Sequence, residues 1–179
     1  ERQWVDRLIA AIRGGHWIVP SVGLPEDVAL GEQWPPERSI PAGAIRTALL
    51  ATGIEADPLG LTIVGARIDG QLDLSHAFCP CPITFAHCFF SQPIRAPGSS
   101  IPQLDLTGSH MPGINLDQAS VKHNLNLVNV RTAHMSLVGG HVGGDLRMRG
   151  TVLSGFSGYA LILDGTTIGG GAFLDGHFE

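Results

Sequence analysis

The fold is decided by residues 104–148, which read LDLTGSHMPGINLDQASVKHNLNLVNVRTAHMSLVGGHVGGDLRM. Two apolar residues separated by one residue recur in this stretch at intervals of 10 or 11 positions. Such pairs run from residue 72 to residue 148: Leu72/Leu74, Ile83/Phe85, Ile94/Ala96, Leu104/Leu106, Ile114/Leu116, Leu125/Leu127, Met135/Leu137 and Leu146/Met148. Alternate pairs begin at residues 83, 104, 125 and 146, which lie 21 apart each time.

A single apolar residue precedes each pair, at Ile68, Phe78, Phe89, Ile101, Met111, Val121, Val130 and Val142 in turn. Each pair is a very short strand with both side chains on one face, too short to be stable alone. A 21-residue unit with four apolar positions therefore predicts one turn of a four-sided parallel β-helix. Turns stacked about 4.8 Å apart would bury a continuous apolar column, and parallel crossovers favour a right-handed coil.

The spacing changes once, after Met148. The next pair, Leu161/Leu163, begins 15 residues after Leu146, and Ala172/Leu174 follows after another 11. The extra residues fall at 155–159, where glycine and serine predict a loop.

Residues 1–60 differ from residues 61–179 and predict a helical N-terminal cap. Apolar residues at Trp4, Val5, Leu8, Ile9 and Ile12 follow a helical spacing that ends at Gly14-Gly15. A second helix is expected at 41–52, after Pro41 and before Gly53, with Ile45, Leu49 and Leu50 buried. Four prolines argue against regular structure at 18–38. The cap would cover the first turn of the coil, whose end exposes apolar side chains and unpaired strands.

At the C-terminal end of the coil, the pair Ala172/Leu174 begins a new side, and no polar cap follows it before Glu179. We expect the coil of residues 61–179 to be truncated at its C-terminal end, as a fragment of a longer solenoid. The alternative is end-to-end self-association of two molecules through that end.

The composition limits the partners. The chain has 179 residues, a net charge of −5 and 15% charged residues. It contains no 18-residue apolar stretch, so no membrane span is expected, and no basic cluster, so nucleic acid is not an expected partner. Three cysteines and the lack of a signal-type segment after Glu1 favour a cytoplasmic setting.

The phrases at 72–78 (LDLSHAF), 104–111 (LDLTGSHM) and 125–130 (LNLVNV) resemble degenerate pentapeptide repeats. The resemblance covers about residues 61–179. It implies a right-handed coil of square turns with a central Leu or Phe pointing inward. The stretch GARIDGQLDLS at 65–75 is similar to bacterial, often actinobacterial, pentapeptide-like proteins, some of which carry an oxidoreductase label.

The strongest candidate for a metal site is the cluster His76, Cys79, Cys81, His87 and Cys88, because thiolates and imidazoles bind zinc. The Cys-Pro-Cys spacing is unusual for zinc, and aromatic residues are interleaved with the thiols. We therefore favour cysteines that fill the core, and assign no metal ligand.

The remaining candidates carry weaker signals. His110, His123, His134 and His141 occupy different repeat positions and form no single ladder. Asp73 with Asp105, or Asp117 with Asp145, could form a carboxylate pair of a polysaccharide-cleaving enzyme. Gly139-Gly140 and Gly169-Gly170-Gly171 lack the Lys-Ser/Thr ending of phosphate loops, so we expect them at corners that need a positive φ. No catalytic or cofactor-binding residue and no cofactor is assigned.

The residues inside the pairs are expected to face solvent: Asp73, Thr84, Arg95, Asp105, Asn115, Asn126, Ser136 and Arg147. A DNA mimic would need a negative face, whereas residues 61–179 carry six basic and eight acidic side chains. The sequence favours a non-catalytic scaffold or interaction module whose partner is another protein. A DNA-mimic topoisomerase-binding protein and a metal-dependent or redox enzyme using Cys79, Cys81 or Cys88 are the alternatives.

Overall fold

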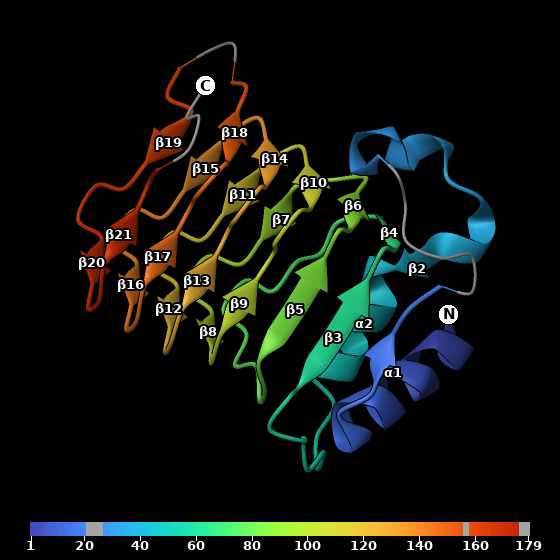
Figure 1. Cartoon of the computed structure of the whole chain (residues 1–179). Helices are drawn as coiled ribbons and strands as arrows, with labels where there is room; N and C mark the ends of the chain where they lie inside the picture. Colours follow the sequence, from blue (N-terminus) through green and yellow to red (C-terminus); the bar gives the residue numbers. More distant parts are fainter. Residues whose placement is uncertain (21–26, 156–157, 176–179) are drawn as a thin grey trace.

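The computed structural model describes residues 1–20, 27–155 and 158–175. Two α-helices, α1 (Arg2–Gly14) and α2 (Ala42–Leu49), and two 3-10 helices, η1 (Val28–Gln33) and η2 (Pro36–Arg38), belong to the first 60 residues. The rest of the described chain consists of short strands that stack in tiers, with α1 and α2 beside β3 and β2 at one end (Figure 1).

The strands form four sheets in which every pairing is parallel. Sheet A contains β1 (Trp17–Ile18), β3 (Leu61–Val64), β5 (Ile83–Ala86), β9 (Leu104–Asp105), β13 (Leu125–Asn126), β17 (Leu146–Arg147) and β21 (Ala172–Phe173). Sheet B contains β2 (Ser39–Pro41), β4 (Arg67–Asp69), β6 (Phe89–Phe90), β10 (His110–Met111), β14 (Arg131–Thr132) and β18 (Val152–Leu153). Sheet C contains β7 (Ile94–Arg95), β11 (Ile114–Asn115), β15 (Met135–Ser136) and β19 (Leu161–Ile162). Sheet D contains β8 (Ser100–Ile101), β12 (Ser120–Val121), β16 (His141–Val142) and β20 (Thr167–Ile168).

From β5 onward, successive strands belong to sheets A, B, C and D in turn. Each strand from β9 onward therefore pairs with the strand four places earlier in the chain. This connectivity is consistent with a parallel β-helix. The predicted column is confirmed, because Leu104 lies in register with Ile83, and Leu125 with both Leu104 and Leu146. These four side chains are at most 3% exposed. The 21-residue period therefore positions the core.

Two of the single apolar residues do not point into the core as the spacing predicted. Phe78 is 76% exposed, and its neighbours Ala77 and Cys79 are buried instead. Phe90, not Phe89, lies in register with Ile68. Adjacent residues of a strand face opposite sides, so only one of two neighbouring apolar residues can enter the core.

The left-handed backbone conformation recurs at two corners of each turn, one between sheets A and B and the other between sheets C and D. At the corner between sheets A and B, His87 and Asn129 adopt φ of 52° and 55°, and Gly108 adopts 68°. A Cβ added to Gly108 would lie 2.4 Å from His87 Nδ1. Two constraints favour glycine at position 108: the positive φ, and the His87 side chain of the preceding turn, which covers this position.

The N-terminal helices agree with the sequence prediction apart from their ends. Helix α1 ends where Gly15 adopts φ 61°. Helix α2 ends at Leu49 and not at residue 52 as predicted, since Leu50 adopts φ −99° and ψ 3°. The side chains of Leu8, Ile12, Ile45 and Leu49 are fully buried. The same segment also adds β1 and β2 to sheets A and B, pairing with β3 and β4.

The predicted loop lies between β18 and β19. Its residues Phe156 and Ser157 lie outside the residues that the structure describes. The residues on either side, Ser154, Gly155 and Tyr159, are exposed.

We predict that Leu125→Ala lowers the free energy of unfolding by about 2–5 kcal/mol, because it leaves a cavity in the middle of the column. Val138→Ala serves as the control, since Val138 is 37% exposed, and should cost less than about 1 kcal/mol. Urea unfolding of both variants measures the difference. Equal losses for the two would contradict a core built on the Leu125 column.

Candidate functional site

The cysteine–histidine cluster predicted as a metal candidate is divided by the fold. Cys79, Cys81 and Cys88 are buried free thiols, as expected for cysteines that fill the core. His76 and His87 are exposed. Among the described residues no three His, Cys, Asp or Glu side chains are grouped so that they could hold a metal ion.

Burial controls the chemistry of the thiols. It raises the pKa of Cys79 and of Cys88 to about 12, and it also raises the pKa of Cys81. The Cys88 Sγ lies 3.5 Å from the carbonyl oxygens of Ile63 and Ala86, to which it donates. All three cysteines are therefore protonated at neutral pH, and a nucleophilic or ligating thiolate is disfavoured.

The proposed carboxylate pairs are not brought together. Asp105 belongs to sheet A, whereas Asp73 forms a bridge with Arg95 beside sheet C. Hydrogen bonds from the Ser75 hydroxyl and backbone N–H lower the pKa of Asp73. Asp105 accepts the equivalent bonds from Thr107. These carboxylates stabilise the turns that follow their strands.

The other pair is separated in the same way. Asp117 follows β11 of sheet C, and Asp145 precedes β17 of sheet A. Asp117 accepts hydrogen bonds from the Ser136 hydroxyl and the Val138 N–H, and Asp145 pairs with Arg147. Asp145 also accepts a hydrogen bond from the Gly171 N–H at 3.0 Å, so both carboxylates are held by the turn that follows.

The glycine runs serve two different purposes. Gly139 adopts φ 63° at a corner, as predicted. The expectation of a positive φ is wrong for Gly140 and for Gly169–Gly171, which do not adopt one. A Cβ added to Gly169 would lie 2.5 Å from the carbonyl oxygen of Gly143, so glycine there permits close approach of two turns.

The four remaining histidines form no common ladder, as the spacing predicted. His110 lies in β10 of sheet B and His141 in β16 of sheet D. His123 lies between β12 and β13, and His134 between β14 and β15.

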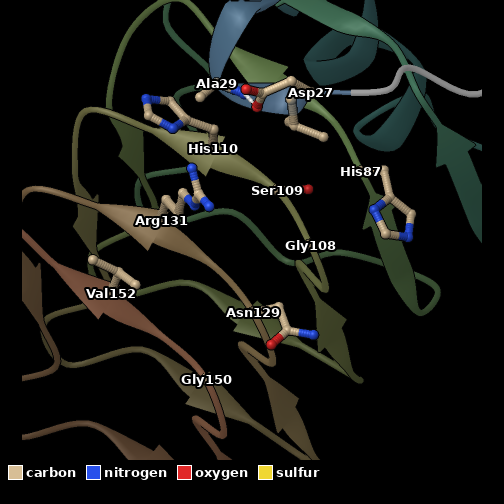
Figure 2. A pocket seen from close by; sticks show the side chains of 11 residues that line it. Asp27, Ala29, His87, Gly108, Ser109, His110, Asn129, Arg131, Gly150 and Val152 are labelled. Atoms are coloured by element: carbon tan, nitrogen blue, oxygen red, sulfur yellow. Dashed lines mark hydrogen bonds between the residues drawn. The ribbon is translucent and has the colours of Figure 1, made fainter. Parts of the chain in front are cut away.

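A groove of about 340 Å³ runs between η1 and the outer face of sheet B (Figure 2). The outward residues of β6, β10 and β14 are Phe89, His110 and Arg131, which lie in register on successive strands. The His110 imidazole stacks on the Phe89 ring, with centroids 5.5 Å apart and planes at 12°. Trp34 covers the same phenyl ring edge-on at 6.4 Å. The aromatic side chains thus fix the orientation of the His110 ring, which lines the groove.

Charged groups reach this histidine from two elements. Burial, and then the positive charge of Arg131, lower the pKa of His110, while Asp27 and Glu32 of the η1 segment act in the opposite direction. Within the described part of the chain, the buried His110 Nδ1 has no hydrogen-bond partner. The imidazole is therefore neutral at pH 7.

The other wall of the groove comes from the left-handed corner between sheets A and B. His87 and Asn129 are exposed there and alternate with Gly108 and Gly150, over which their side chains lie. In Figure 2, His87 and Asn129 lie across the groove from His110 and Arg131.

Sequence reasoning named His87 and His110 in two separate candidates, the cysteine–histidine cluster and the isolated histidines, and it did not single out Arg131, Asn129 or Asp27. The 21-residue period contains a signal for part of the groove, since residues 89, 110 and 131 occupy one repeat position.

Comparison with known proteins finds no matching family model, no matching curated protein and no matching solved structure. Across the described residues, no helix combines the length and the apolar character that crossing a membrane requires.

We predict that none of the three thiols reacts appreciably with Ellman's reagent in the folded protein, because they are buried and protonated. All three should react once the chain is unfolded in urea. The absorbance of the coloured thiolate released from the reagent gives the number of reactive cysteines. A rapid, stoichiometric reaction of the folded protein would contradict the burial of Cys79, Cys81 and Cys88.

We also predict that stability falls as His110 is protonated. Its pKa is lower in the folded than in the unfolded chain, so its contribution is present above about pH 6.5 and is lost as the pH falls through the folded value. Urea unfolding between about pH 7 and pH 5 should therefore show a smaller loss of stability in His110→Gln than in the wild type.

The control is Val138→Ala, which changes a partly exposed side chain that does not titrate. It should retain the pH dependence of the wild type. If the free energy of unfolding of His110→Gln depended on pH as steeply as that of the wild type, the prediction for His110 would be contradicted.

Proposed function

We propose that this protein is a non-catalytic scaffold or protein-interaction module, built on a right-handed, four-sided β-helix of the pentapeptide-repeat type. The return of the chain to each of four sheets in turn supports four sides. Parallel crossover connections are nearly always right-handed, which supports the hand of the coil. The inward Leu104, Leu106, Leu125 and Leu127 support the likeness to pentapeptide repeats.

The main support for this function is that polar side chains on the outer surface are held in fixed positions. Polar side chains of adjacent turns bind one another, as Asn126 Nδ2 donates to Asp105 Oδ2 at 3.0 Å. Asp117 bridges to the next turn through Ser136 and Val138. A surface whose side chains are fixed at the spacing of the strands requires little ordering when a partner docks. This favours protein docking over catalysis.

The alternatives have less support. The sheet A ladder presents Asp105, Asn126 and Arg147 in sequence, an acid, an amide and a base, instead of the continuous negative face of a DNA mimic. The buried, protonated thiols argue against a redox or metal-dependent enzyme, because the thiolate is the reactive and metal-binding form. The three unpaired cysteines support a cytoplasmic setting for the scaffold.

Exposed apolar side chains provide the means to test the proposal. Trp17 on sheet A is 67% exposed and Phe78 beside sheet D is 76% exposed. Large aromatic side chains of this kind dominate protein interfaces. We predict that the wild type captures a specific bacterial protein, and that Trp17→Ser or Phe78→Ser weakens this binding at least about tenfold.

The partner is identified by mass spectrometry, and its affinity is then measured with purified proteins. Val138→Ala, a smaller surface change, should leave the affinity unchanged. If both aromatic variants bind every captured protein as the wild type does, the proposed docking faces are wrong.

A further inference from the structure

The groove on sheet B contains an arginine that the fold does not use. The described residues form three ion pairs, through Arg67, Arg147 and Arg149. Arg131 takes part in none of them, and no side-chain hydrogen bond joins it to the described residues. Its side chain is exposed and borders the groove. A planar guanidinium with free N–H donors is the side chain best suited to hold a carboxylate through two hydrogen bonds.

The neighbours of Arg131 favour a small anion at this place. The neutral His110 lies beside it on β10 and adds no second charge. Across the groove, the Asn129 amide and the His87 imidazole are exposed and supply further polar contacts. The volume of about 340 Å³ is at the lower end of the range for small-molecule sites.

The roof of the groove restricts the ligand further. Asp27 lines it, and one of its oxygens, Oδ1, accepts a hydrogen bond from the Ala29 N–H. The carboxylate as a whole would repel a simple anion. A ligand that carries a hydrogen-bond donor next to its own carboxylate would instead bind Arg131 and Asp27 together.

The floor of the groove is formed by the left-handed corner between sheets A and B. Asn129 adopts this conformation with a full side chain, so positive φ alone does not demand glycine at the equivalent positions 108 and 150. A Cβ at Gly108 would lie 2.4 Å from His87 Nδ1, and one at Gly150 would lie 2.3 Å from Asn129 Oδ1. Glycine at both positions therefore lets the His87 and Asn129 side chains lie along the corner, where they supply polar groups to the groove.

We propose that this groove binds a small carboxylate with an adjacent hydrogen-bond donor, the arrangement of α-hydroxy and α-amino acids, held by Arg131 and Asp27. This site is independent of protein docking, which is proposed on other faces of the coil.

The experiment is an NMR titration of the full chain at low salt and pH 7 with lactate, alanine, propionate and inorganic phosphate. Lactate, alanine or both should produce saturable shifts of the backbone amides of His87, His110, Asn129 and Arg131. Propionate lacks the donor of lactate and should bind at least about tenfold more weakly. Binding of phosphate as tight as that of lactate would overturn the carboxylate assignment.

Three variants test the two contacts. Arg131→Gln should weaken lactate binding at least about tenfold, and Arg131→Lys should have an intermediate effect because it keeps the charge without the planar fork. Asp27→Asn should reduce the preference for lactate over propionate, since it removes the repulsion of a simple anion. Lys122→Gln, which removes an exposed charge between β12 and β13, is the matched control and should bind as the wild type does.

The Arg131 side chain is exposed, so these variants are expected to fold, and circular dichroism verifies this. An absence of saturable shifts in the groove with both lactate and alanine would overturn the proposal, as would equal affinity of the wild type and Arg131→Gln. Either result would leave protein docking unaffected, because that function is measured with a different partner and with variants at Trp17 and Phe78.

Discussion

The hydrogen bonds between successive turns are the constraint on which this molecule depends. Most strands of the coil are two residues long, and none of those could persist alone. Leu125 N–H donates to the Asp145 carbonyl at 2.9 Å, and Leu104 N–H donates to that of Asn124 at 3.3 Å. Each turn thus satisfies the backbone of the next, and the apolar columns inside can form only while this register holds. The outer ladders and the groove follow from the same register.

The sequence period predicts the core because the hydrogen-bond register repeats with it. Leu104 and Leu125 occupy the predicted column, and the helix containing Ile45 begins next to Pro41 as predicted, although it ends at Leu49, before the Gly53 signal. The prediction fails at Phe78 and at Phe89, where two apolar residues adjoin. Local periodicity cannot decide which of two neighbours turns inward. At Phe89 the decision depends on Trp34, which is more than 50 residues away in the sequence and covers the outward ring.

The groove was less accessible to sequence reasoning than the core. Its roof, at Asp27, comes from a segment without periodicity, and its place over sheet B depends on the packing of η1 against Phe89. Phe89, His110 and Arg131 could have been aligned from the period alone, because they are 21 residues apart. Their proximity to Asp27 could not have been predicted, since no local pattern connects residue 27 with residue 131. The burial of the cysteines was predicted on other grounds, from the tendency of free cysteines to be buried and from the aromatic residues around them, because the repeat itself placed Phe78 and Phe89 inward.

The junction between β18 and β19 shows how the coil can accept change. Arg131 pairs with Val152, 21 residues later, whereas Met135 pairs with Leu161, 26 residues later, and the longer offset persists at Leu146 and Ala172. Five additional residues are thus absorbed at one corner while the strands on both sides keep their parallel partners. Corners are therefore the places where evolution, or an engineer, can graft new recognition loops without rebuilding the interior.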